Sequence, residues 1–199
     1  MLQLSALTPL GTGRHRQCFL HPTHPERCIK IVYNLESGGD KELNRELNYY
    51  AHLEGRLEDW SGIPRYYGTV NTDLGTGYVY DIIKDVDGTA SVSLTEFAKE
   101  CQQAGNLATL DKVLARLQVY LRDNRIVTMT IKPQNILCQR RGGDDIMPVV
   151  VDNIGESTFI PLATWSAWMC ARKQQRLWQR FIGNKIFAGT EAQRKAGLA

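Results

Sequence analysis

The sequence predicts an α+β protein in which most strands precede most helices. Short runs rich in β-branched and aromatic residues, separated by Gly, Pro and Asp-Gly, indicate antiparallel strands. These runs cover residues 4–10, 17–21, 28–33, 64–72 and 78–83. Apolar residues at spacings of three and four predict helices at 41–57, 107–121 and 163–182. We therefore expect a sheet with one helix in residues 1–84 and a helical part in residues 85–199.

The helix at 41–57 interrupts the expected strands. Its apolar residues fall on one stripe, with polar residues on the opposite side, and the stripe consists of Leu43, Leu47, Tyr50 and Leu53. A helix with this pattern buries its apolar side, so we expect it to dock on the sheet.

The helix at 107–121 has the strongest apolar stripe of the chain. Asn106 or Thr109 could cap its start, and the pattern ends near Asp123-Asn124. It follows a polar stretch, residues 85–93, which we interpret as the connection between the two parts of the chain.

The last predicted helix is rich in tryptophan and in positive charge. Trp165, Trp168 and Trp178 could form a docking face, but their spacing favours burial against the preceding helix. Between residues 172 and 195 the positive residues far outnumber the acidic ones, of which Glu191 is the lone example. A solvated helix face with a frayed tail is the more common meaning of such a pattern, and a surface for a polyanion or a membrane is the alternative.

Composition limits the classes of function. The 199 residues are 43% hydrophobic and 23% charged, as in an ordinary globular protein of one or two small domains. No stretch is apolar enough to span a membrane and the amino terminus lacks a signal-peptide pattern, so we expect a cytoplasmic protein. The net charge of +3 is too small to suggest nucleic acid as a partner. The 5 cysteines are scattered, which predicts free and mostly buried thiols rather than disulfides or zinc ligands.

Glycines between the first two expected strands are the first candidate site. Gly11 and Gly13 would let the backbone approach a phosphate and present its N–H groups. Without a third glycine, this pattern is more typical of a hairpin turn. Arg14, His15 and Arg16 could add charge to the turn, but exposed basic residues on tight turns usually have no such role.

A lysine inside an apolar strand is the second candidate. Lys30 lies in Cys28-Ile29-Lys30-Ile31-Val32, where an ammonium must face solvent or be paired. The following helix supplies Glu42 and Glu46. We favour Glu46 as the partner, because it lies beside the apolar stripe of that helix, and a carboxylate there could aim the ammonium at nucleotide phosphates.

Two segments in the second part carry the strongest signal. Lys132-Pro133-Gln134-Asn135 forms a loop after the long helix, and Asp152 follows the apolar run Val149-Val150-Val151. A carboxylate at a strand end beside a glycine turn suits Mg²⁺, which takes few protein ligands and completes its shell with phosphate and water. Each segment alone is an ordinary loop, but their order and spacing make a shared site the better interpretation.

This order of motifs resembles the protein-kinase-like fold. In amino-acid sequence, the chain from Leu10 to about Phe181 is similar to the bacterial YrbL family of PhoP-regulated, kinase-like proteins. The segments that carry this resemblance are 63–68, 77–81, 131–137 and 152–157, of which the last two are the most specific. The resemblance implies a minimal bilobal fold with a small antiparallel sheet lobe, a truncated helical lobe and a nucleotide between them.

The resemblance also implies roles for single residues. Lys30 would contact phosphates, Glu46 would hold Lys30, and Lys132 would face the transferred phosphate. Asn135 and Asp152 would bind Mg²⁺, and the glycine turn would cover the phosphates. The backbone of the connecting segment, at Asp81 and Ile83, would meet the adenine. ATP and Mg²⁺ are the implied cofactors.

Three departures from the kinase pattern bear on activity. Thr130 occupies the place of the catalytic base and cannot usefully accept a proton at neutral pH; Asp123 and Glu156 are nearby substitutes. One residue is inserted between Asp152 and its glycine. Too few residues follow for a substrate-holding helical subdomain. We therefore expect a pseudokinase-like protein that binds ATP and Mg²⁺, either as a degenerate kinase or as an atypical phosphoryl or nucleotidyl transferase. The alternative is a non-catalytic regulatory module that acts through a protein partner.

Overall fold

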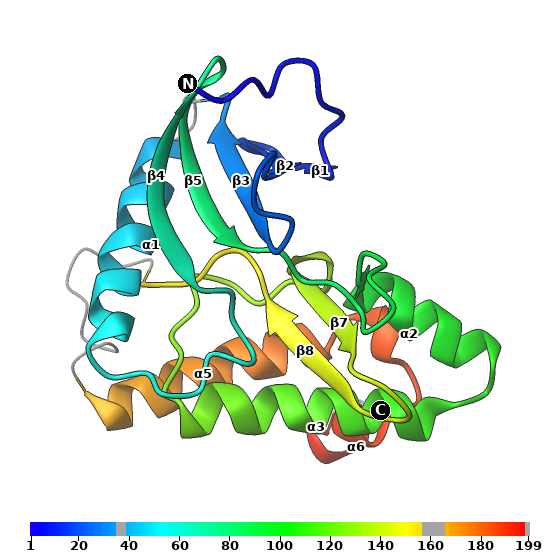
Figure 1. Ribbon diagram of the computed structural model, residues 1–199. Coiled ribbons are helices and arrows are strands. Elements are labelled where there is room, and N and C mark those ends of the chain that lie inside the picture. Colours follow the sequence, from blue (N-terminus) through cyan, green and yellow to red (C-terminus); the bar gives the residue numbers. More distant parts are fainter. Residues whose placement is uncertain (35–38, 157–165, 198–199) are drawn as a thin grey trace.

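The computed structural model describes residues 1–34, 39–156 and 166–197. It confirms the α+β prediction. A five-stranded antiparallel sheet with one helix occupies one end of the molecule, and the other helices gather at the opposite end around a small second sheet (Figure 1).

The five-stranded sheet has the order β1-β2-β3-β5-β4. Its strands are β1 (Gly11–Thr12), β2 (Arg16–Leu20), β3 (Arg27–Val32), β4 (Tyr66–Thr72) and β5 (Gly75–Asp81). In the pairing of β2 with β3, Cys18 is opposite Lys30, and in the pairing of β3 with β5, Lys30 is opposite Tyr78. Because alternate residues point to opposite faces, Lys30 lies on the face opposite to the buried Ile29 and Ile31.

The strand expected at residues 4–10 is wrong. The amino-terminal segment crosses the face formed by Ile29, Ile31 and neighbouring residues, where Leu4 is fully buried. The carboxylate of Asp73 accepts hydrogen bonds from the N–H groups of Leu4 at 2.7 Å and Ser5 at 3.2 Å. The Asp73 side chain therefore accepts hydrogen bonds from backbone N–H groups that, in a strand, would have paired with a neighbouring strand.

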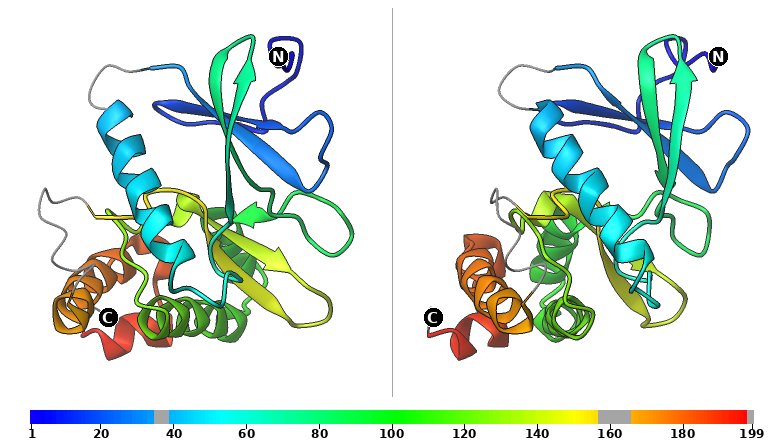
Figure 2. Two further views of the ribbon diagram at one scale, coloured as in Figure 1. Left: turned by 60° about the vertical axis from the view of Figure 1, so that its left-hand side comes forward. Right: turned by 90° about the vertical axis from the view of Figure 1, so that its left-hand side faces the viewer.

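Helix α1 (Gly39–Glu54) packs on the other face of the sheet, as its apolar stripe predicts. The views of Figure 2 show it running diagonally across the sheet towards the second half of the molecule. Tyr50, 1% exposed, places its ring against Trp60, Tyr66 and Tyr80 at centroid distances of 5.6–6.3 Å. This aromatic cluster fixes α1 to the sheet.

The second half combines helices with a three-stranded sheet. The sheet, of order β6-β7-β8, contains β6 (Val92–Ser93), β7 (Ile136–Arg140) and β8 (Ile146–Val150). The longer helices are α2 (Leu94–Gln103), α3 (Leu107–Asp123) and α5 (Ala167–Ile182). Three short segments complete it: η2 (Pro133–Asn135), η3 (Lys185–Phe187) and α6 (Glu191–Lys195). Asn106 caps α3, as one of the two predicted candidates.

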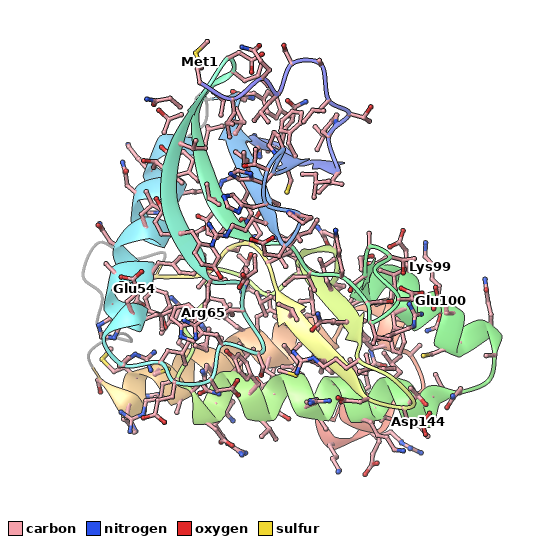
Figure 3. All side chains as sticks on the ribbon, viewed as in Figure 1. Met1, Glu54, Arg65, Lys99, Glu100 and Asp144 are labelled. Atoms are coloured by element: carbon pink, nitrogen blue, oxygen red, sulfur yellow. The ribbon has the colours of Figure 1, made fainter. Side chains whose placement is uncertain are left out.

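One main hydrophobic core extends through both halves. It joins Tyr50 and Leu53 of α1 to Leu114 and Leu117 of α3 and to Val149 of β8. Side chains fill the space between the ribbons of the two halves, as Figure 3 shows. The halves are therefore packed as a continuous unit.

The tryptophans of α5 do not share one role. Trp178 is half-buried and packs on the core, in agreement with the prediction. Trp168 is 65% exposed and lies 4.8 Å beneath the guanidinium of Arg172, so the expectation of burial is wrong for it. Trp165 lies outside the described residues.

The thiol prediction is confirmed, because all the cysteines are free and only Cys18 is more than slightly exposed. No helix among the described residues is long and apolar enough to cross a membrane.

Candidate functional site

Lys30 extends from the middle of β3 to the segment that follows β8. Its ammonium donates a hydrogen bond to the carbonyl oxygen of Val151 at 2.6 Å and lies 4.4 Å from the centroid of the Tyr80 ring. The lysine is thus not an outward-facing surface residue. It joins the five-stranded sheet to the residue immediately before Asp152.

Glu46 is buried at the centre of the same region, with only 1% of its side chain exposed. One carboxylate oxygen accepts a hydrogen bond from Nη1 of Arg16 at 2.8 Å, and the other accepts from the Tyr80 hydroxyl at 2.9 Å. The kinase-like resemblance implies that Glu46 holds Lys30, but in the structure the cation that Glu46 holds is Arg16. The choice of Glu46 over Glu42 agrees with its position facing the sheet.

Arg16 also reaches the carboxylate of Asp152, with Nη1 3.3 Å from Oδ1. Burial by itself lowers the pKa of Arg16, but the charges of Glu46 and Asp152 outweigh burial and hold the pKa above its ordinary value. Burial and the neighbouring Glu46 raise the pKa of Tyr80, so its hydroxyl stays protonated and donates. We name Arg16, Lys30, Glu46, Tyr80 and Asp152 the Arg16 network.

A tight turn holds Asp152 beside α1. Gly155 has a φ of +116°, and a Cβ at this position would lie 3.2 Å from the carbonyl oxygen of Arg45 in α1. Only glycine combines this backbone conformation with so close an approach. The glycine turn predicted after Asp152 therefore brings the aspartate to the helix that carries Glu46.

The Thr130 loop runs antiparallel to the Asp152 segment. Thr128 forms a bridge with Ile154, and the N–H of Met129 donates to the carbonyl of Asn153 at 2.8 Å. Thr130 follows this bridge by two residues, and Asp152 precedes the bridge partner Ile154 by two residues, so the two segments lie side by side here. The Thr130 hydroxyl oxygen is buried, and within the described part of the chain no hydrogen bond to it is formed.

Asn135 lies at the end of η2, next to the same segment. Its carbonyl accepts a hydrogen bond from the N–H of Val151 at 2.9 Å, which sets the asparagine beside the residue that binds Lys30. Lys132 precedes η2 and is exposed. The structure thus brings Lys30, Glu46, Asn135 and Asp152 into one region, and the loop that carries Thr130 lies beside the Asp152 segment.

The predicted glycine turn is a hairpin between β1 and β2. Gly11 pairs with Cys18, and the N–H of Gly13 donates to the carbonyl of Arg16 at 2.8 Å. Both glycines are exposed. A Cβ on Gly11 would meet nothing within 4 Å, so local packing does not require glycine there.

The connecting segment begins at the end of β5. The Asp81 carboxylate accepts hydrogen bonds from the Arg65 N–H and the Tyr67 hydroxyl, at 2.7 and 2.8 Å. The carbonyl of Ile83 accepts from the N–H of Ser91 at 3.4 Å. Both residues are half-buried, and these contacts fix the chain where it passes between the two halves.

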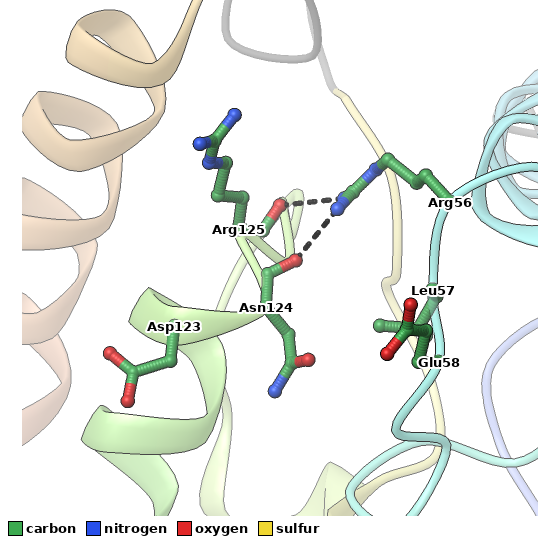
Figure 4. Close-up of a pocket in the computed structure, with 6 residues that line it drawn as sticks. All are labelled: Arg56, Leu57, Glu58, Asp123, Asn124 and Arg125. Carbon is green, nitrogen blue, oxygen red and sulfur yellow. Dashed lines mark hydrogen bonds between the residues drawn. The ribbon is translucent and has the colours of Figure 1, made fainter.

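The proposed substitutes for the missing base are engaged elsewhere. Glu156 is buried in an ion pair with Lys173, with Oε1 and Nζ 3.1 Å apart. Asp123 lines a separate pocket of about 320 Å³ at the end of α3, together with residues that follow α1 (Figure 4). There, Arg56 donates hydrogen bonds to the carbonyls of Asn124 and Arg125, and no member of the Arg16 network lines this pocket.

Comparison with known proteins identifies the family. The family described as PhoP regulatory network protein YrbL matches residues 2–185. The chain belongs to this family. It is 62% identical over 188 residues to the YrbL proteins of Escherichia coli (strain K12) and Shigella flexneri, an alignment that covers 94% of this chain and 90% of each relative.

In this YrbL-family chain, sequence reasoning missed two members of the network. Arg16 was grouped with exposed turn residues, yet its side chain is only 13% exposed. Strand alternation could have found it, because Arg16, Cys18 and Leu20 share the face of β2 that pairs with Lys30. Tyr80 belongs to the same face through its pairing with Cys28.

Proposed function

We propose that this protein binds a nucleoside triphosphate together with Mg²⁺ at the Arg16 network. The observation that carries the proposal is the convergence of Lys30, Glu46 and Asp152 from three distant segments. Each was singled out for nucleotide chemistry from the sequence, and hydrogen bonds or ion pairs connect all of them to one another through Arg16, Tyr80 and Val151. The sheet with one helix, set against a helical second half, is the arrangement that the kinase-like resemblance implies.

The oxygen donors present suit magnesium. Asp152 is 41% exposed, and Asn135 lies next to the neighbouring strand end, so both could contribute oxygen ligands. Within the described ranges no three acidic, histidine or cysteine side chains gather as a metal cluster. Phosphate oxygens and water would therefore complete the shell. When bound, the ion would offset the charge of the phosphates and bring them to Asp152.

The chain's own residues favour binding over transfer. Thr130, in the loop that lies beside the Asp152 segment, offers a hydroxyl instead of a carboxylate base, while Glu156 is paired with Lys173 and Asp123 with Arg122. Positioning and charge stabilisation supply most of phosphoryl-transfer catalysis, so transfer to an acceptor is the second candidate function. In the kinase-like pattern, Thr130 takes the position that orients an acceptor, and its hydroxyl oxygen is buried without a hydrogen bond in the described part of the chain.

A thermal-shift experiment tests nucleotide binding. At a hundredfold excess of Mg·ATP over its Kd, the melting temperature should rise by roughly 5–10 °C. Asp152→Ala should remove most of this rise, because it deletes the metal carboxylate. The matched control is Asp144→Ala, in the exposed β7–β8 turn, which should keep the full rise. The absence of any shift in the unmodified protein would refute the proposal.

Labelled ATP decides between binding and transfer. We expect neither γ- nor α-label to appear on the protein or on added acceptors, with nucleotide recovered intact. Transfer of γ-label would establish a phosphotransferase, and transfer of α-label a nucleotidyltransferase. Thr130→Ala should leave the thermal shift intact in either case, since the Thr130 hydroxyl makes no hydrogen bond to the Arg16 network.

A further inference from the structure

Glu46 orients one cation, and that cation is Arg16. The two side chains are 13% and 1% exposed, and Nη1 lies 2.8 Å from Oε2. A carboxylate buried to this extent requires a partner, because an unpaired buried charge is strongly destabilising. The position of the guanidinium is therefore fixed by the helix α1.

Lys30 has a different set of contacts. The two oxygens of Glu46 accept hydrogen bonds from Arg16 and from the Tyr80 hydroxyl, and Lys30 forms neither a hydrogen bond nor an ion pair with Glu46. The Lys30 ammonium instead donates to the carbonyl of Val151 at 2.6 Å and lies over the Tyr80 ring. These contacts tie β3 to the strand end before Asp152, which is a structural task.

Arg16 keeps donors for a ligand. A guanidinium carries five N–H groups in a planar fork. Both contacts of Arg16 with carboxylates use Nη1; within the described residues Nε and Nη2 make no hydrogen bond, and neither is a buried unpaired atom. A fork held through one nitrogen by a buried carboxylate, with other N–H groups that make no hydrogen bond to the described residues, suits bidentate binding of phosphate oxygens.

Asp152 completes the arrangement. Its side chain is 41% exposed and touches Arg16 through the longer of the two contacts, 3.3 Å. A metal ion at Asp152 would replace this contact and leave Arg16 held by Glu46 alone. The guanidinium would then be free to face the phosphates that the ion brings.

We propose that Arg16, positioned by Glu46, is the side chain that grips the polyphosphate of the bound nucleotide, and that Lys30 acts as a structural tie. This inference rests on the proposed function and assigns the phosphate contact to a different residue from the one expected from the sequence. The ligand class is a Mg²⁺-bound nucleoside di- or triphosphate.

Isothermal titration with ATP, ADP and AMP, each with Mg²⁺, tests the assignment. Arg16→Gln should weaken ATP binding by about 10- to 100-fold, as expected for loss of a charge-assisted bidentate contact. AMP affinity should change by less than about threefold. Arg16→Lys should restore only part of the loss, because an ammonium lacks the fork. Lys30→Gln should lower the melting temperature but leave the ratio of ATP to AMP affinity near that of the unmodified protein.

A paired variant protects the test from folding defects. Arg16→Gln leaves Glu46 buried without a cation, so Arg16→Gln combined with Glu46→Gln removes both charges and keeps an acceptor for Tyr80. Circular dichroism and AMP affinity verify that this double variant is folded, and it should show the same loss of preference for ATP.

The outcomes separate two failures. The assignment to Arg16 is wrong if Arg16→Gln and the double variant with Glu46→Gln both keep the ratio of ATP to AMP affinity of the unmodified protein. It is also wrong if Lys30→Gln alone abolishes that ratio. In either case the proposed nucleotide binding stands. If the unmodified protein binds none of the three nucleotides, the proposed function fails and this inference fails with it.

Discussion

The pKa of the Cys18 thiol depends on neighbouring side chains, among them Lys30 of the Arg16 network. It lies opposite Lys30 in the pairing of β2 with β3, on the face that also carries Arg16. The neighbouring Cys28 side chain lowers the pKa of the Cys18 thiol, burial opposes this effect, and the charge of Lys30 lowers the pKa further. The other cysteines are buried, and burial raises the pKa of Cys101, Cys138 and Cys170. Cys18 is thus the thiol best placed to react.

We predict that alkylation of the folded protein occurs first at Cys18. The thiolate is the reactive form, so a lowered pKa makes the rate rise at lower pH than for an ordinary cysteine. Cys28→Ala removes the neighbouring thiol and should move the midpoint of the pH profile upwards, and Lys30→Met should do so to a smaller extent. Cys101→Ala, in α2, is the control and should leave the profile unchanged.

Mass spectrometry of peptides after brief treatment with iodoacetamide gives both the site and the rate. Preferential labelling of any other cysteine would contradict the prediction. A Cys18 midpoint at or above that of the same cysteine in urea would contradict the stated cause.

At the scale of elements, sequence pattern could predict those site residues that stand out from an apolar setting. Lys30 interrupts a strand, Glu46 lies beside a helix stripe, and Asp152 follows a run of valines. Arg16 does not stand out, because it is one of several basic residues near a turn. Only the register between β2 and β3 separates it from its exposed neighbour Arg14, and register depends on pairing across the sheet.

The incorrect strand and the missing helix have different causes. The segment 4–10 has strand-like residues, but the distant Asp73 takes its donors and turns it into an irregular cover for the sheet. Helix α2 was not predicted, although its start carries a capping box in which Ser93 and Glu96 exchange hydrogen bonds. The conformation of segment 4–10 depends on a long-range contact that local sequence pattern does not show. The start of α2, in contrast, has a local signal, because the capping box is present in the sequence as Ser-Leu-Thr-Glu.

At the scale of the molecule, the main core contains residues from both sides of the boundary expected at residue 84. Leu53 of α1 and Leu117 of α3 are both fully buried in the same cluster. In this core, aromatic rings from α1, β4 and β5 contact one another. A core shared in this way couples the sheet and the helical half, so neither half is expected to unfold without exposing apolar surface of the other.

We therefore predict a single cooperative unfolding transition. Urea denaturation followed by far-ultraviolet circular dichroism and by tryptophan fluorescence should give the same midpoint, because Trp60 precedes β4 and Trp178 belongs to α5. Leu53→Ala should lower the free energy of unfolding by about 2–5 kcal/mol and shift both signals together. Leu74→Ala, at a position 39% exposed in the β4–β5 turn, should change it by less than about 0.5 kcal/mol. Separate midpoints, or a Leu53→Ala shift confined to one signal, would show that the two halves unfold independently and that the Arg16 network joins them only at their surfaces.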